Sequence, residues 1–70
     1  MDEISFKLST DSIELCRLLK ATGLCESGGA AKQVITAGEV CVNGRVEIRK
    51  AFQVRSGDRV EYAGAAVLVQ

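Results

Sequence analysis

The chain opens with apolar and polar residues in strict alternation. Ile4, Phe6 and Leu8 alternate with Ser5 and Lys7, and a period of two is typical of a half-buried strand. The apolar spacing then becomes helical over roughly residues 12–36 and returns to a period of two near residue 39. The pattern therefore predicts a strand, a helical region and a further set of strands.

The first predicted helix begins after Asp11 and ends at Gly23. Asp11 can cap it, and Glu14 follows three residues later at the spacing of a capping box. Gly23 can adopt the left-handed conformation that commonly ends a helix. The face expected to be buried comprises Ile13, Leu15, Cys16, Leu18 and Leu19.

A second helix is predicted from Ser27, its cap, to Gly38, with an inward face of Ala31, Val34 and Ile35. Gly28 and Gly29 in its first turn are poor helix formers, each costing about 1 kcal/mol relative to alanine. Two interpretations stay open. The bare helix start can offer backbone amides to a phosphate, or the small residues simply permit close packing on the first helix.

From Glu39 onward the chain predicts short strands. Val40 and Val42 alternate with Cys41, which should point away from the core, and Asn43-Gly44 favours a two-residue hairpin turn. The returning strand is expected over 45–48, with later strands near 54, 60–62 and 67–69. A strand, two short packed helices and a small, mostly antiparallel sheet define an α+β fold.

Composition narrows the class of protein. Seventy residues, 47% of them hydrophobic and none proline, predict one compact domain over residues 1–70 with a small core. No run approaches the roughly 18 apolar residues of a membrane helix, and the acidic start differs from the basic start of a signal peptide. We therefore expect a monomeric, cytoplasmic protein.

The net charge is zero, but the charges are unevenly distributed. Residues 1–14 carry four acidic side chains against one basic, whereas residues 15–59 carry eight basic against four acidic. The balance over residues 15–59 is thus +4, and folding can gather these cations on one side. A solvated surface of mixed charge is the alternative.

No recognisable catalytic set is present. The chain has no histidine, the commonest general base, and its glycines match neither a nucleophile elbow nor a phosphate-binding loop. Cys16, Cys25 and Cys41 are too few for a structural zinc site without histidine. The sequence predicts a protein that is not an enzyme, holds no metal or cofactor, and has buried or incidental thiols.

An ordered set of motifs does stand out. Two adjacent helices end at Gly38, a Val-x-Val-Asn-Gly segment follows over 40–44, and a Val-x-x-Gly-Asp-x-Val segment occupies 54–60. In these features, over roughly residues 12–62, the chain resembles the RNA-binding domain named after the fourth protein of the small ribosomal subunit. Because little lies outside the motifs, it is most similar to the stand-alone, single-domain subgroup of that family.

The resemblance implies an alpha-L motif, in which two helices and the following hairpin rest against structured RNA such as ribosomal or transfer RNA, with the ribosome or another protein as a further partner. One departure stands out, because many members have arginine directly after the helix-opening serine, where this chain has Gly28. Carried over by position, the RNA-binding residues are Lys20, Ser27, Lys32, Arg45, Arg49 and Lys50.

Other partners are weighed against structured RNA. Single-strand readers stack bases on aromatic side chains, whereas Phe6 and Phe52 are more typical of a core or its rim. A protein-interaction adaptor is the main alternative, and exposed apolar surface around Cys41 and Ala63–Ala66 would mark it. The hypothesis of a DNA-binding module has less support, because no helix carries the Asn, Gln and Arg cluster of a protein that reads the major groove.

Overall fold

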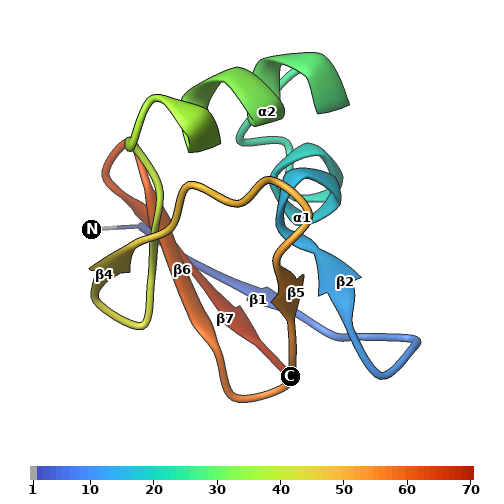
Figure 1. Ribbon diagram of the computed structural model, residues 1–70. Helices are drawn as coiled ribbons and strands as arrows, with labels where there is room; N and C mark the ends of the chain where they lie inside the picture. Colours follow the sequence, from blue (N-terminus) through green and yellow to red (C-terminus); the bar gives the residue numbers. More distant parts are fainter. Residues whose placement is uncertain (1) are drawn as a thin grey trace.

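Two helices pack over a small sheet in the structure, a computed structural model that describes residues 2–70 (Figure 1). Met1, the first residue of the predicted domain, lies outside the described residues. The elements in chain order are β1 (Asp2–Phe6), β2 (Ile13–Glu14), α1 (Leu15–Ala21), α2 (Gly28–Thr36), β3 (Cys41–Val42), β4 (Arg45–Val46), β5 (Gln53–Val54), β6 (Arg59–Tyr62) and β7 (Ala65–Val69).

The main sheet has the strand order β1-β7-β6-β3-β4. β1 runs parallel to β7, and the other neighbours in this sheet are antiparallel. β2 and β5 form a separate antiparallel pair. The predicted α+β fold with a mostly antiparallel sheet is therefore confirmed.

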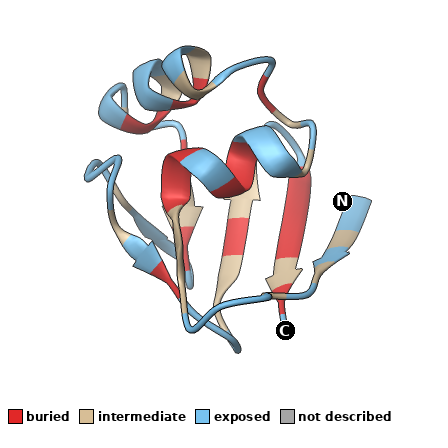
Figure 2. Cartoon of the chain, turned by 90° about the vertical axis from the view of Figure 1, so that its right-hand side faces the viewer, coloured by how far each residue is buried: buried red, intermediate tan, exposed pale blue. Residues whose placement is uncertain are grey.

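The core lies between the helices and the sheet, where the buried positions of both meet (Figure 2). Burying one leucine, isoleucine or valine side chain stabilises the fold by about 1.5–3 kcal/mol relative to leaving it exposed. The largest fully buried side chains are Leu15, Leu18, Leu19, Ile35, Val40, Val54, Val60 and Val67. The helix faces predicted from the apolar spacing are thus the ones that pack.

The predicted start of the first helix is wrong. α1 begins at Leu15, its N-cap is Glu14 without a side-chain cap, and Ile13 belongs to β2. The amides of Leu15 and Cys16 donate instead to backbone carbonyls of the segment that follows β4. A tertiary contact therefore satisfies the helix start where a local capping box from Asp11 was expected.

The second helix begins as predicted. The Ser27 hydroxyl oxygen accepts a hydrogen bond from the Ala30 amide at 3.1 Å, the geometry of an N-cap. Ala31 and Ile35 are buried and Val34 packs against the core from its edge. Gly38 follows with φ +80° and lets the chain turn directly into β3.

The hairpin between β3 and β4 is confirmed at its turn. Asn43 and Gly44 have φ of 53° and 84°, as a two-residue turn of this type requires. The returning strand is shorter than predicted, because regular strand covers only Arg45–Val46 at the edge of the sheet, although the Glu47 amide still donates to the Val40 carbonyl at 3.0 Å. Val46 and Ile48 are each 60% exposed as the chain leaves that edge.

The three thiols differ in burial. Cys16 and Cys25 belong to the core, and burial raises the pKa of Cys25, whereas Cys41 is half-buried outside the core cluster. Among residues 2–70, no cluster of metal-binding side chains forms, and no helix has the length and apolar character needed to cross a membrane.

Candidate nucleic-acid interface

The loop between β4 and β5, residues 47–52, is anchored on the start of α1. The Leu15 amide donates to the Phe52 carbonyl at 2.9 Å, and the Cys16 amide donates to the Lys50 carbonyl at 3.1 Å. These bonds satisfy two amides that a helix start otherwise leaves without partners. They also fix the backbone of Lys50 beside α1.

The two helices supply further cations. Lys20 lies in the last turn of α1 and Lys32 lies within α2, and the two helices pack directly on each other. Both side chains are exposed, as are those of Arg45, Arg49 and Lys50. All five predicted cations therefore reach solvent from ordered elements.

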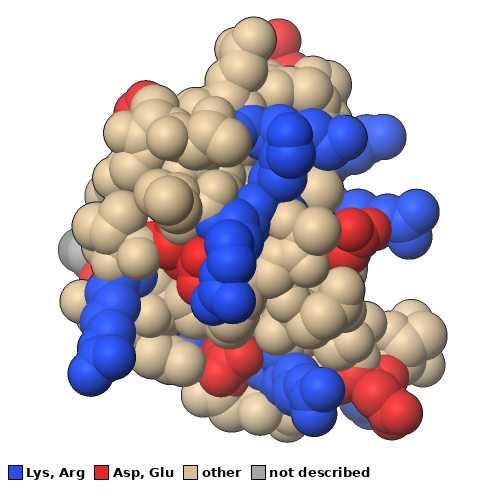
Figure 3. Space-filling model, viewed as in Figure 1, with Lys and Arg blue, Asp and Glu red and all other residues tan. Residues whose placement is uncertain are grey.

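Figure 3 shows how the cations are distributed on one face. A band of Lys and Arg side chains runs from beside the helices across the loop between β4 and β5. A separate cationic group lies over the β3–β4 hairpin, with carboxylate atoms between it and the band. Arg45 is the only cation of the hairpin segment 39–47. On this face the cations therefore form a band and a separate group over the hairpin, with carboxylates between the two.

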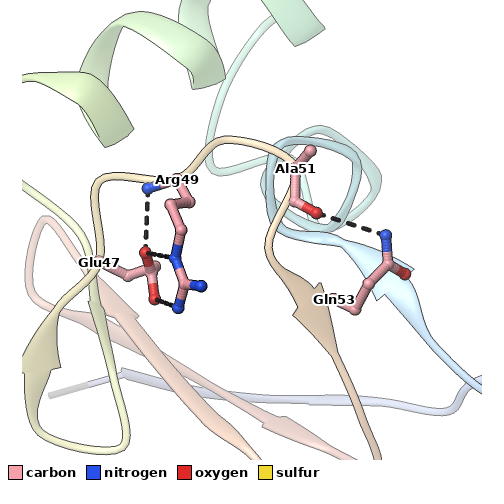
Figure 4. Close-up of polar contacts among 4 residues, drawn as sticks. All are labelled: Glu47, Arg49, Ala51 and Gln53. Carbon is pink, nitrogen blue, oxygen red and sulfur yellow. Dashed lines mark hydrogen bonds and ion pairs between the residues drawn. The ribbon is translucent and has the colours of Figure 1, made fainter.

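Arg49 is paired with a carboxylate of its own loop (Figure 4). Its Nε donates to Oε2 of Glu47 and its Nη2 to Oε1, both at 2.9 Å, and its backbone amide donates to Oε2 at 3.0 Å. These bonds lower the pKa of Glu47 from its ordinary value of 4.5 to about 2. The charge of Arg49 is therefore compensated in the unbound protein.

The other predicted cations are not compensated in this way. Within residues 2–70, no carboxylate lies within ion-pair distance of the cations Lys20, Lys32, Arg45 and Lys50. Unpaired cations keep their full charge for a polyanion such as RNA.

Ser27 is the one uncharged residue in the predicted set. Its hydroxyl oxygen is used by the Ala30 amide, but the hydroxyl still has a proton to donate. Next to it, a side-chain carbon added to Gly28 would meet no described atom within 4 Å. The backbone at the start of α2 is therefore open at Gly28.

Sequence reasoning missed two residues near this surface. These residues are Phe52 and Glu47. The guanidinium of Arg49 lies over the Phe52 ring, 5.0 Å from its centre, and forms an ion pair with the Glu47 carboxylate. Glu47, Arg49 and Phe52 lie in the loop after β4, outside regular secondary structure. No pattern in the sequence therefore indicated the ion pair or the contact with Phe52.

A helix pair leads directly into an Asn-Gly hairpin, with exposed cations on both helices and the adjoining loop. The model of the S4 domain family matches residues 6–70. This chain belongs to the S4 domain family, which confirms the resemblance found in the sequence.

Relatives of the stand-alone subgroup support the same conclusion. The chain is 47% identical over 57 residues to "Putative RNA-binding protein YbcJ" of Escherichia coli and, equally, to "Uncharacterized protein YbcJ" of Shigella flexneri. Each alignment covers 81% of this chain and 81% of the relative. The solution structure of Escherichia coli YbcJ, described as revealing an alpha-L motif involved in RNA binding, matches 99% of this chain and 89% of its own. The TM-score is 0.74 at 41% identity.

Proposed function

We propose that this chain is an RNA-binding protein whose single domain, residues 1–70, recognises structured RNA, ribosomal or transfer RNA-like. The name of the Escherichia coli relative and the alpha-L motif of its structure support RNA as the partner. In the proposal the protein is a cytoplasmic monomer that acts without catalysis or cofactor, on the ribosome or beside another protein.

One observation carries the proposal. Lys20, Lys32 and Lys50 are exposed, make no ion pair within residues 2–70, and belong to helices and a loop that backbone hydrogen bonds hold in place. Contacts with phosphates set affinity and orientation without reading sequence. Folded RNA presents mainly shape, phosphates and 2′-hydroxyls. Exposed, unpaired lysines on elements held in place therefore suit a structured RNA backbone.

The binding test is a salt series with a folded stem-loop RNA. If about four phosphates are neutralised, the logarithm of the affinity should fall with the logarithm of the salt concentration at a slope of roughly −3 to −4. Filter binding at several salt concentrations measures the slope. A flat salt response would contradict the proposal.

A variant series tests which residues form the interface. The double change Lys32→Ala and Lys50→Ala should weaken binding and reduce the magnitude of the salt slope by nearly two. Lys7→Ala is the matched control, because Lys7 is also exposed but follows β1, outside the predicted set. Equal effects of the double variant and the control would remove these lysines from the interface.

The adaptor alternative is favoured by one feature, although not the one expected. Of the surface expected around Cys41 and Ala63–Ala66, Ala65 and Ala66 are buried. Val46 and Ile48 are instead each 60% exposed at the sheet edge. Val46→Ser with Ile48→Ser should leave RNA affinity unchanged if RNA is the partner. Two results together would favour the adaptor. The lysine double variant would keep its RNA affinity, and the serine variant would lose a protein that co-purifies with the wild type.

A further inference from the structure

We propose that a hollow below the loop between β4 and β5 holds one unpaired nucleotide of the bound RNA, with its base against the Arg49–Phe52 pair and its phosphate at Arg55. This inference rests on the proposed RNA-binding function and specifies it further. The predicted RNA contacts do not include Phe52 or Arg55.

The hollow is an open surface feature of about 780 Å³. Sites for small ligands commonly measure about 300–1,000 Å³ and combine apolar walls with a few polar groups, so one nucleotide fits this space. In Figure 3 uncharged atoms and a group of carboxylate atoms lie between the cationic band and the cations near the turn between β5 and β6. The lining residues are Arg49, Ala51, Phe52, Gln53, Arg55, Ser56 and Asp58.

Arg49 presents a supported planar surface at one side of the hollow. Glu47 bonds both its Nε and its Nη2, which fixes the guanidinium in one orientation, and the Phe52 ring lies under it at 5.0 Å. The Arg49 side chain is still 71% exposed. Because the charge is already compensated, the remaining capacity of this side chain is stacking, for which a guanidinium plane is suited.

Arg55 supplies a positive charge that no carboxylate compensates, unlike that of Arg49. Its side chain is exposed and forms no ion pair among residues 2–70. The carboxylate of Asp58 also lines the hollow, but its oxygens accept from the Asn43 amide group at 3.0 Å and from the Arg55 backbone amide at 2.8 Å. The free guanidinium of Arg55 is therefore available to a phosphate.

Gln53 lines the edge of the hollow, and its side chain points toward β2, away from Arg49 (Figure 4). The Gln53 Nε2 donates to the Ala51 carbonyl at 3.3 Å (Figure 4), and its Oε1 accepts from the Ser12 hydroxyl at 2.7 Å. These bonds fix the amide and leave one N–H of Nε2 to donate.

The combination favours a nucleotide over simpler ligands. An inorganic anion would use Arg55 but leave the surface of Ala51 and Phe52 exposed, and an aliphatic ligand would leave Arg55 unmatched. Proteins that bind folded RNA commonly take up unstacked bases from bulges and loops on aromatic or arginine planes. The shared residue Arg49 places such a base next to the proposed phosphate-binding face.

The hollow itself is tested by NMR titration with adenosine 5′-monophosphate, with adenosine and inorganic phosphate as separate probes. The monophosphate should shift the amide signals of Ala51, Phe52, Gln53 and Arg55 more than either probe alone. Arg55→Gln should reduce these shifts to those seen with adenosine. Shifts confined to other residues, or an equal response to inorganic phosphate, would overturn the site.

The RNA form of the test uses two stem-loops that differ by one bulged nucleotide. The wild type should bind the bulged RNA about tenfold more tightly, in line with the worth of stacking one base. Phe52→Leu, which keeps an apolar side chain, combined with Arg55→Gln should abolish the preference and bind the paired stem-loop as the wild type does.

The two outcomes of failure are distinct. Equal wild-type affinity for both stem-loops would overturn the nucleotide site while leaving RNA binding intact. Failure to bind either RNA would overturn the proposed function, and the titration with mononucleotide would then decide the hollow by itself. Thermal unfolding of the Phe52→Leu and Arg55→Gln single variants identifies any loss caused by misfolding.

Discussion

The Nδ2 of Asn43 donates a hydrogen bond of 3.0 Å to Oδ1 of Asp58, fifteen positions further along the chain. The Oδ1 of Asn43 in turn accepts from the Arg59 amide at 2.9 Å. These two hydrogen bonds connect the Asn43-Gly44 turn to the Gly57-Asp58 motif and fix the position of the hairpin relative to it.

Removing this link should destabilise the fold. Asn43→Ala loses both side-chain bonds and places alanine at φ 53°, so the free energy of unfolding should fall by about 1–2 kcal/mol. Urea denaturation measures it. In a double-mutant cycle with Asp58→Ala, the two losses should be coupled by about 0.5–1.5 kcal/mol. Strictly additive losses would show that the two motifs are independent.

Neutralising Glu47 should strengthen RNA binding. Glu47→Gln removes the charge that compensates Arg49, while the amide oxygen of glutamine can still accept from the Arg49 backbone. Affinity for the stem-loop should rise a few-fold, and the salt dependence should steepen by about one phosphate contact. Glu61→Gln makes the same change of charge on β6, at a carboxylate that forms no ion pair with Arg49. If both variants raise affinity equally, only net charge matters.

The ion pair also predicts a pH dependence. The pKa of Glu47 is lowered to about 2 from 4.5, so its contribution to stability is complete above pH 4.5 and declines as the pH falls towards 2. NMR titration of the carboxyl should give the low pKa in the wild type and a higher pKa in Arg49→Gln, where the bonds from backbone amides remain but those from the guanidinium are lost. Arg17→Gln is the control. A wild-type midpoint near 4.5 would contradict the observed geometry.

The parts of the fold set by local chemistry were predictable. The Asn43-Gly44 turn follows from backbone preference, and Ser27 caps a helix because its hydroxyl reaches an amide three residues away. The start of α1 was not predictable from local sequence. Its amides bond to Lys50 and Phe52, far along the chain, and such partners are fixed only when the chain has folded.

The candidate site shows the same division. The sequence predicted exposed cations at Lys20 and Lys32 correctly, because solvent-facing helix positions follow from the apolar period. It did not predict that Glu47 would compensate Arg49 or that Phe52 would support it. Those contacts arise in an irregular loop, where no period relates sequence spacing to direction.

Ser27 separates stability from RNA binding. Ser27→Ala removes the cap on α2 and should lower the free energy of unfolding by about 1 kcal/mol. Ser27→Asp caps equally well, so stability should stay near wild type. Its carboxylate, next to the open backbone of Gly28, would repel a phosphate and should weaken stem-loop binding. Urea denaturation and filter binding on both variants measure the two effects. Full RNA affinity in Ser27→Asp would exclude the start of α2 from the interface and confine it to the lysines and the loop.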